Sequence, residues 1–462
     1  MTRYIATLFT VIHLILLSHA AIGQTGSELD KAVATLRNIS GEKLSAKQQE
    51  ERAKQIDETW KLLIAKGAPA AERLRQEIEK VDRNKEQDDF FKLNASVVLW
   101  EIGKVGEADH IAKIWTSTPV AAQYNYVFYT AFAAAQTKDP RVLPMLRAIL
   151  RDDKGSIFVG LHSMTVAWPL SHEFIWGSYG PAGLPVLAEI LEKSNDEVEL
   201  RSAMKLLSRA QYLPSLPRIR KLAADDRVRV RSEAIQSLGI YGHPDDYDRL
   251  LVGLTSNDPL ELFSSAFALY EFEDERAVKH LIPLLQKPGD GVKVEASLAL
   301  LHLLTPEAFA AVKSFVSKTT NPEIKQYLTR SLTLREEKLP KDFSSLSRDQ
   351  QAIALDKYRD AELIPSPADP KISNQQLRQA LAVWKEKGRI YDSGSDWIGE
   401  ARVIAAAKPE DLELILEAQS AFYRRLSDEC LYEVRDLGKA IKYIGRSRYR
   451  KGLGVSAKAE LK

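Results

Sequence analysis

The sequence predicts an all-α fold, an α-solenoid of stacked helical hairpins followed by a small C-terminal helical domain. A helical pattern recurs four times, in Leu200–Leu207, Val230–Leu238, Leu262–Tyr270 and Val294–Leu301. Each copy carries an alanine, and the alanines are about 31 residues apart. Repeats of about 20–50 residues are typical of solenoids. The chain of 462 residues is also long for one core, whereas a solenoid only packs neighbouring repeats together.

The N-terminal part before the repeats, residues 24–91, is predicted to cap the solenoid. Residues 24–46 are polar, and we expect them to be loosely ordered. From Lys47 to about Val81 the apolar residues have helical spacing, interrupted at Gly67-Ala68-Pro69. This pattern predicts a helical hairpin, and terminal repeats are expected to depart from the consensus because one face meets water.

The repeats proper are predicted over residues 92–338. In the clearest copy, which starts at Val228, a first helix reaches Leu238-Gly239, a turn carries Pro244, and a leucine-rich second helix follows. The alanines let helices approach closely, Gly239 is expected to end its helix in a left-handed conformation, and Pro244 and Pro306 to begin new helices. The four repeat alanines are Ala203, Ala234, Ala266 and Ala296.

This copy resembles the HEAT repeats of the short bacterial type, which also occur in phycocyanobilin lyases. The resemblance extends over more than half of the chain and implies an α-solenoid. It implies no particular chemistry, because one fold serves many functions.

Residues 339–370 are predicted to form a proline-containing linker, and residues 371–462 a separate helical domain with a basic tail. Within this domain the sequence predicts helices over Gln375–Lys387, Trp397–Ala407 and Pro409–Gly445. The only cysteine, Cys430, falls on the apolar stripe of the third helix, which predicts a buried structural residue and no intramolecular disulfide.

The first 23 residues have the pattern of a secretory signal peptide. Arg3 precedes an apolar run from Tyr4 to Leu17, and small residues follow, with cleavage expected after Ala20 or Gly23. The run is shorter than the roughly 20 apolar residues of a spanning helix, which makes a retained anchor the alternative. We therefore expect an exported protein, periplasmic or secreted.

Charge and motifs argue against several functional classes. The net charge is +2, and the chain lacks a Gly-rich phosphate loop, a His-Glu-x-x-His motif and a Gly-x-Ser-x-Gly motif. Only one His-Glu pair occurs, which is too few ligands for a di-iron centre of the deoxyhypusine hydroxylase type. We therefore expect no catalytic residues, no metal, no cofactor and no nucleic-acid partner.

The repeat pattern fails between Ser156 and Gly183, where aromatic residues accompany histidines and glycines. Irregular segments on a rigid scaffold often carry binding residues, although aromatic residues in such a segment also cover a core. The candidate partner-binding residues in this segment are Trp168, His172, Glu173, Trp176 and Tyr179.

The C-terminal basic tail is a second candidate contact. Arg446, Arg448 and Arg450 lie near two tyrosines and few acidic residues. Such a cluster suits an acidic protein or an anionic envelope component, while an ordinary basic helix end is the alternative.

The sequence thus predicts an exported, non-catalytic scaffold or adaptor that mediates protein–protein interaction in the cell envelope. The alternative is a periplasmic enzyme or small-ligand-binding protein. It would use residues 157–181, with His162, His172 and Glu173 at its centre.

Overall fold

The computed structural model describes residues 26–38, 46–81, 86–118, 125–151, 171–303, 305–337, 339–347, 350–351, 354, 372–387, 400–423 and 431–448. Every regular element in these ranges is a helix. The chain divides into two compact units, Met1–Lys154 and Gly155–Lys462. The predicted leader over residues 1–23, Cys430 and most of the predicted linker lie outside the described residues.

The first unit consists of helical hairpins that begin earlier than the sequence suggested. Its elements are α2 (Gly26–Asn38), α3 (Ala46–Lys66), α4 (Ala68–Glu79), α5 (Glu86–Gly103), η2 (Lys104–Glu107), α6 (Ala108–Ser117), α7 (Asn125–Gln136), η3 (Pro140–Val142) and α8 (Leu143–Ile149). The expectation of a loosely ordered segment is wrong for α2, which packs against α3 and α5. Its buried Ala32, Val33 and Leu36 supply the contact. The hairpin broken at Gly67 is confirmed as α3 and α4.

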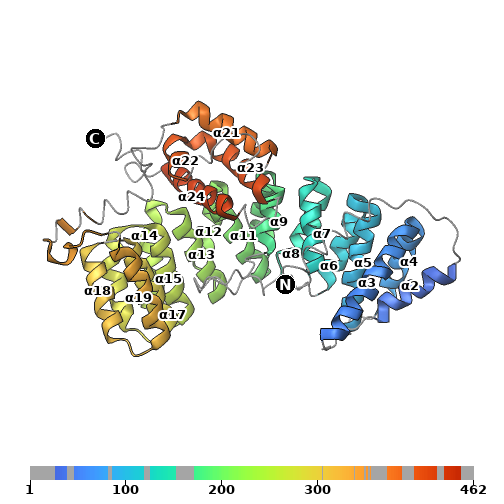
Figure 1. The fold of residues 1–462 in the computed structure, drawn as a ribbon, viewed down its shortest axis with the longest axis horizontal. Helices are drawn as coiled ribbons and strands as arrows, with labels where there is room; N and C mark the ends of the chain where they lie inside the picture. The colour runs from blue at the N-terminus through green and yellow to red at the C-terminus, as the bar shows by residue number, and fades with distance from the viewer. Residues whose placement is uncertain are drawn as a thin grey trace. The chain divides into compact units, whose positions relative to one another are not determined.

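The second unit begins with a series of paired helices (Figure 1). These elements are α9 (Ser171–Tyr179), η4 (Pro181–Gly183), α10 (Leu184–Lys193), α11 (Glu197–Arg209), η5 (Leu213–Ser215), α12 (Leu216–Leu222), α13 (Val228–Tyr241), η6 (Pro244–Asp246), α14 (Tyr247–Leu251), η7 (Val252–Thr255), α15 (Pro259–Phe272), η8 (Glu275–Ala277), α16 (Val278–Leu281), η9 (Ile282–Gln286), α17 (Asp290–Leu303), α18 (Pro306–Lys318), α19 (Pro322–Glu336) and η10 (Phe343–Ser345).

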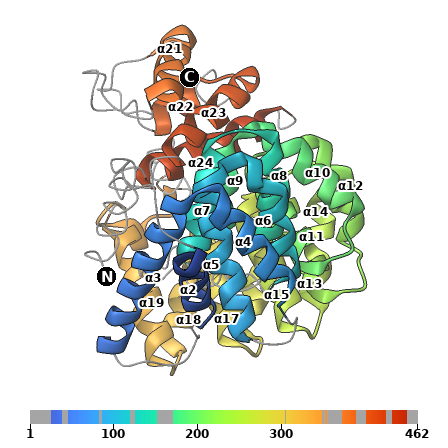
Figure 2. The same cartoon turned by 90° about the vertical axis from the view of Figure 1, so that its right-hand side faces the viewer.

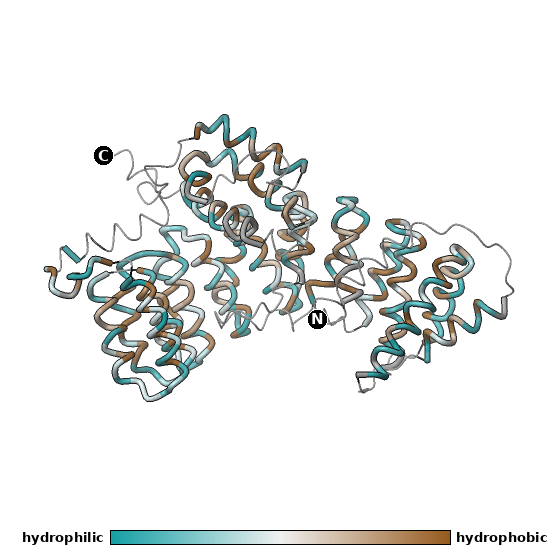
Figure 3. The backbone as a smooth tube through the Cα atoms, viewed as in Figure 1, coloured by the Kyte–Doolittle hydropathy of each residue, from teal (hydrophilic) through white to brown (hydrophobic). Residues whose placement is uncertain are grey.

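The first helices of successive repeats, α11, α13, α15 and α17, pack side by side. The second helices α10, α12 and α14 cover one side of this row (Figure 2). The four repeat alanines are fully buried in the row, as their small size predicts for close helix contacts. Apolar and polar stretches alternate along these helices (Figure 3), consistent with one buried side on each.

Gly239 has a different role from the predicted one. Helix α13 continues through it to Tyr241, and the left-handed residue that ends the helix is Gly242, with φ of 63°. A Cβ atom on Gly239 would lie 2.5 Å from both Cα and O of Ala268 in α15. Gly239 is therefore a point at which the backbones of two adjacent repeats come into close contact.

Several helices begin with the same device, a polar cap directly before a proline. Asp258 accepts a hydrogen bond from the amide of Leu260, and Thr305 accepts one from the amide of Ala308. The prolines that follow these caps have no N–H to satisfy and have φ already suited to a helix. The predicted helix starts at Pro244 and Pro306 are confirmed.

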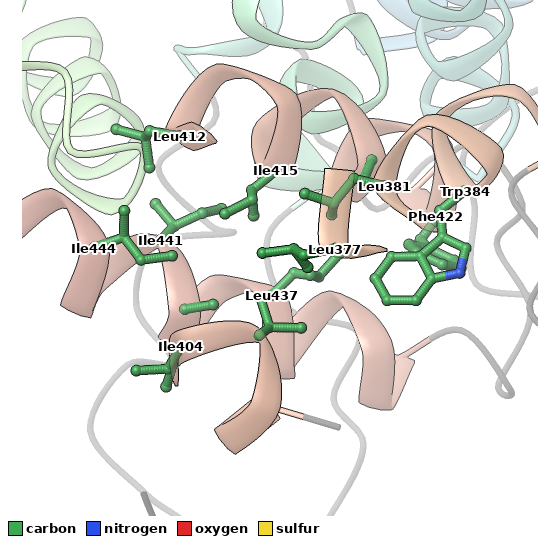
Figure 4. Close-up of a cluster of buried hydrophobic side chains, with 13 residues drawn as sticks. Leu377, Leu381, Trp384, Ile404, Leu412, Ile415, Phe422, Leu437, Ile441 and Ile444 are labelled. Carbon is green, nitrogen blue, oxygen red and sulfur yellow. The ribbon is translucent and has the colours of Figure 1, made fainter. Parts of the chain in front are cut away.

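The C-terminal helices also belong to the second unit and enclose an apolar core of their own. They are α21 (Asn374–Lys387), α22 (Glu400–Ala406), η12 (Pro409–Asp411), α23 (Leu412–Tyr423) and α24 (Leu431–Ser447). In place of the predicted long third helix, α23 and α24 are separate and pack against each other. Figure 4 shows the core, in which Leu377, Ile415 and Ile441 point inward, with the Trp384 ring 6.2 Å from that of Phe422.

The close approach at Gly239 gives a first prediction. Gly239→Ala should lower the free energy of unfolding by about 1–3 kcal/mol, because the added methyl group overlaps backbone that cannot move aside. This loss should exceed the gain in helix propensity, which is about 1 kcal/mol. Urea unfolding followed by circular dichroism would measure it. Gly291→Ala is the matched control, since nothing lies within 4 Å of its added Cβ, and an equal response of the two variants would contradict the assignment.

Candidate functional site

The structure places the predicted aromatic residues of α9 inside the second unit. Trp176 and Tyr179 are buried, and both rings lie against Gly183. Trp168 and His162 lie outside the described residues, as does the side chain of His172. Glu173 forms an ion pair with Arg209 of α11. Their assignment to partner binding stays a prediction, and the described members take part in contacts within the chain.

Helix α23 packs on α9 through specific polar and aromatic contacts. The hydroxyl of Tyr423 donates to Glu173 at 3.1 Å, and that of Ser420 donates to the carbonyl of Ser178 at 3.0 Å. The rings of Tyr423 and Phe174 meet edge to face at 5.2 Å. Burial and the neighbouring Glu173 raise the pKa of Tyr423 well above its ordinary value, so this hydroxyl remains a donor.

Helix α24 packs on the ends of the repeat helices through a half-buried ionic cluster. Lys442 lies 2.9 Å from a carboxylate oxygen of Glu271 and 2.7 Å from one of Glu273. The hydroxyl of Tyr443 donates to Glu273 at 3.2 Å. Burial opposes ionisation of both glutamates, but Lys442 and Arg446 outweigh it, and the pKa values of Glu271 and Glu273 are lowered.

Arg446 caps two helices at once. Its guanidinium donates to the carbonyls of Gly239 and Ile240 in the last turn of α13, at 2.8 and 2.9 Å. It also donates to the carbonyl of Glu271 in the last turn of α15, at 2.5 Å. Because the C-terminal ends of helices carry partial negative charge, a cation here is favoured. The side chain is only 3% exposed.

The three predicted arginines of the tail therefore occupy different surroundings. Arg446 is engaged within the chain, Arg448 is exposed, and Arg450 lies outside the described residues. Binding of a partner by these residues stays a prediction. The structure adds that the helix carrying Arg446 joins the C-terminal helices to the repeats.

Two charged residues that the sequence analysis did not single out lie on the row of first helices. Lys205 of α11 is 6% exposed and Glu295 of α17 is 5% exposed. Within the described residues, neither side chain has a hydrogen bond or an ion pair. An unpaired charge in such surroundings is unfavourable, and natural proteins seldom keep one without a reason.

The surroundings perturb both groups in the expected directions. Burial lowers the pKa of Lys205 to about 8, assisted by Arg209 and opposed by Glu233 of α13. Burial raises the pKa of Glu295 to about 7, assisted by Glu271. Ionisable groups perturbed in this way concentrate at functional sites.

Lys205 and Glu295 occupy repeat-equivalent faces. Lys205, Gln236, Phe267 and Leu298 follow one another at intervals of 31 residues, and so do Glu233, Ser264 and Glu295. The amide of Gln236 donates to the hydroxyl of Ser264 at 2.9 Å, which joins the two columns across α13 and α15. We call the surface formed by these seven residues the inner face. The 31-residue spacing allows these residues to be aligned from the sequence. Their burial, and the lack of partners for Lys205 and Glu295, could be recognised only in the structure.

Aromatic residues surround the acidic end of the inner face. The ring of Tyr270 lies 4.6 Å from that of His302 and 6.2 Å from that of Phe267. Burial raises the pKa values of Tyr270 and of Tyr327 in α19; Glu271, Glu273 and Glu295 assist at Tyr270, and Glu295 assists at Tyr327. The chemistry offered here is an unpaired carboxylate beside aromatic rings.

Two further classes of site are absent from the described part of the chain. No group of three or more histidine, cysteine, aspartate or glutamate residues there is arranged to hold a metal ion. None of the helices described is long and apolar enough to cross a membrane.

The docking of α24 leads to a second prediction. Arg446→Met should weaken the contact of α24 with α13 and α15 by about 3–5 kcal/mol, because it leaves Glu273 and the helix-end carbonyls with less compensation. Hydrogen exchange of α24 should accelerate. Lys439→Met is the control, since Lys439 is an exposed cation of the same helix. Similar exchange in the two variants would rule out the capping role.

The unpaired charges lead to a third prediction, in which the two variants show opposite pH trends. For Glu295, with a raised pKa, folding is penalised increasingly as pH rises from 4.5 towards about 7, and the full penalty is on the order of 3 kcal/mol. Glu295→Gln should therefore raise the thermal midpoint at about pH 8 more than at about pH 4.5.

For Lys205, with a lowered pKa, the penalty is complete below about pH 8 and disappears as pH rises through 10.5. Lys205→Met should therefore stabilise the protein at about pH 7 and lose this advantage at about pH 10. The groups near Lys205 are Arg201 and Arg209 of its own helix, Glu173 and Glu233; those near Glu295 are Tyr270, Glu271 and Tyr327. Destabilisation by both substitutions at every pH would mean that the charges stabilise the fold.

Comparison with known proteins agrees with the repeat geometry. No curated protein matches the chain. The family model of HEAT repeats matches residues 184–269, which run from α10 into α15. This part of the second unit, which holds Lys205, Gln236 and Phe267 of the inner face, is a HEAT-repeat domain.

Proposed function

We propose that the protein is an exported, non-catalytic scaffold that binds a protein partner on the inner face of its HEAT repeats. The observation that carries this proposal is the pair of buried, unpartnered charges on a row of stacked HEAT helices. HEAT repeats commonly mediate protein binding, and stacked repeats offer an extended surface for it. Buried charges that lower the stability of a fold are expected where a ligand supplies their partners.

The envelope location rests on the N-terminal pattern of an apolar run followed by small residues. The exposed Arg448 and the neighbouring Arg450 supply a second contact, with an acidic partner or an anionic envelope component. Since Glu173 is engaged by Arg209 and Tyr423, we favour the scaffold over a small-ligand site at residues 157–181.

The test of this function is photo-crosslinking in the native cell. A photoreactive residue at Gln236, on the inner face, should capture one protein in stoichiometric amount. The same group at Val252, which is 67% exposed and lies in η7 and not among the inner-face residues, should not. Recovery of the uncrosslinked chain alone from both positions would reject the scaffold function.

Export is tested separately by cell fractionation. The full chain should appear in the periplasm or the medium, and a variant that lacks residues 1–23 should remain in the cytoplasm. Arg448→Gln together with Arg450→Gln should release the exported protein from membranes or cell wall at low salt. Unchanged fractionation of this double variant would reject the tail contact. The proposed binding of a partner on the inner face does not depend on this result.

A further inference from the structure

The inner face carries its two unpartnered charges at opposite ends, and they have opposite signs. Lys205 lies on α11 and Glu295 lies on α17. The first helices α13 and α15 lie between them in the row. Both side chains are more than nine-tenths buried. The described residues give neither charge a hydrogen bond or ion pair, so a ligand that satisfies both must present an anion and a cation.

The distance between the two ends excludes a small zwitterion. Adjacent packed helices are about 8–10 Å apart, so three helix spacings amount to roughly 24–30 Å. An extended chain advances about 3.3 Å per residue. A peptide segment of about eight or nine residues therefore has the length to reach from Lys205 to Glu295.

The unpaired charge at each end determines which residue of a ligand that end favours. Arg201 and Arg209 flank Lys205 in α11 but face Glu197 and Glu173. The unpaired ammonium of Lys205 is therefore what makes this end favour an acidic residue. Glu271 lies near Glu295 but is already bound by Lys442. The unpaired carboxylate of Glu295 is therefore what makes the other end favour a basic residue. A nucleic acid would meet these glutamates with its phosphates, and a membrane surface would meet the same acidic end. A protein segment satisfies both ends.

Glutamates next to the acidic end already bind a lysine of the chain itself. Lys442 of α24 binds Glu271 and Glu273, with Tyr443 beside it. Glu295 lies on the next helix near Glu271, but no cation forms an ion pair with it within the described structure. A lysine or arginine placed there would also lie near the ring of Tyr270, which favours a cation.

We propose that the inner face binds an extended segment of a protein partner with an acidic residue on Lys205 and a basic residue about eight positions away on Glu295. This inference rests on the proposed scaffold function and adds the charge order and spacing of the partner. Between the two charges, Gln236 and Ser264 can contact the backbone of the segment. Phe267 and Leu298, both half-buried, offer apolar contact.

A phage-displayed library of random dodecapeptides, selected on the full chain, tests the inference. Enriched peptides should share one acidic and one basic residue about eight positions apart, in one order. Glu295→Gln should abolish selection of the basic residue and weaken an enriched peptide by about tenfold, while Lys205→Met should do the same for the acidic residue. Lys279→Met and Glu307→Gln, at exposed positions of α16 and α18, are the matched controls.

Several outcomes would overturn the inference. These are enrichment without the spaced charges, equal binding by all four variants, or no enrichment on the wild-type chain. Failure of the scaffold function is recognised separately by in-cell crosslinking at Gln236. If a partner is captured at Gln236 but the selected peptides lack the spaced charges, the scaffold function stands and only the segment proposed here is rejected.

Discussion

The close packing of the first helices is the constraint on which the second unit depends. Ala203, Ala234 and Ala296 keep side-chain volume small along the row, and Gly239 brings α13 and α15 into backbone contact. Each helix buries one side against its neighbours and the second helices, so its opposite side lies on the inner face. The 31-residue period therefore sets both the core and the arrangement of the charges.

Periodicity was sufficient to predict the helices but not their endings or surroundings. The break at Gly67 and the starts at Pro244 and Pro306 could be recognised because glycine and proline act locally on the backbone. Helix α2 was missed because its short apolar stripe is diluted by polar residues. The role of Gly239 could not be anticipated, because it depends on Ala268 of the next repeat. Family resemblance suggested repeats over a wider range than the 184–269 that the family model matches.

The candidate site illustrates the same limit in electrostatic terms. A basic stretch at the C-terminal end of the sequence looks like a surface feature. In the structure, Lys442 is paired with Glu271 and Glu273, and Arg446 is hydrogen-bonded to helix-end carbonyls. Conversely, Lys205 and Glu295 are ordinary residues of amphipathic helices until their burial and missing partners are known. Composition counts charges, whereas function depends on which of them the fold leaves uncompensated.

The double contact of Arg446 has a mechanical consequence. Solenoids bend and twist by small rotations between adjacent repeats. One guanidinium bound to the last turns of both α13 and α15 makes relative rotation of these helices break hydrogen bonds of charged groups. The C-terminal helices thus act as a brace across that joint and make the elasticity of the repeat row uneven. A partner that bends the row would have to do so at joints that the brace does not span, such as the one between α17 and α19.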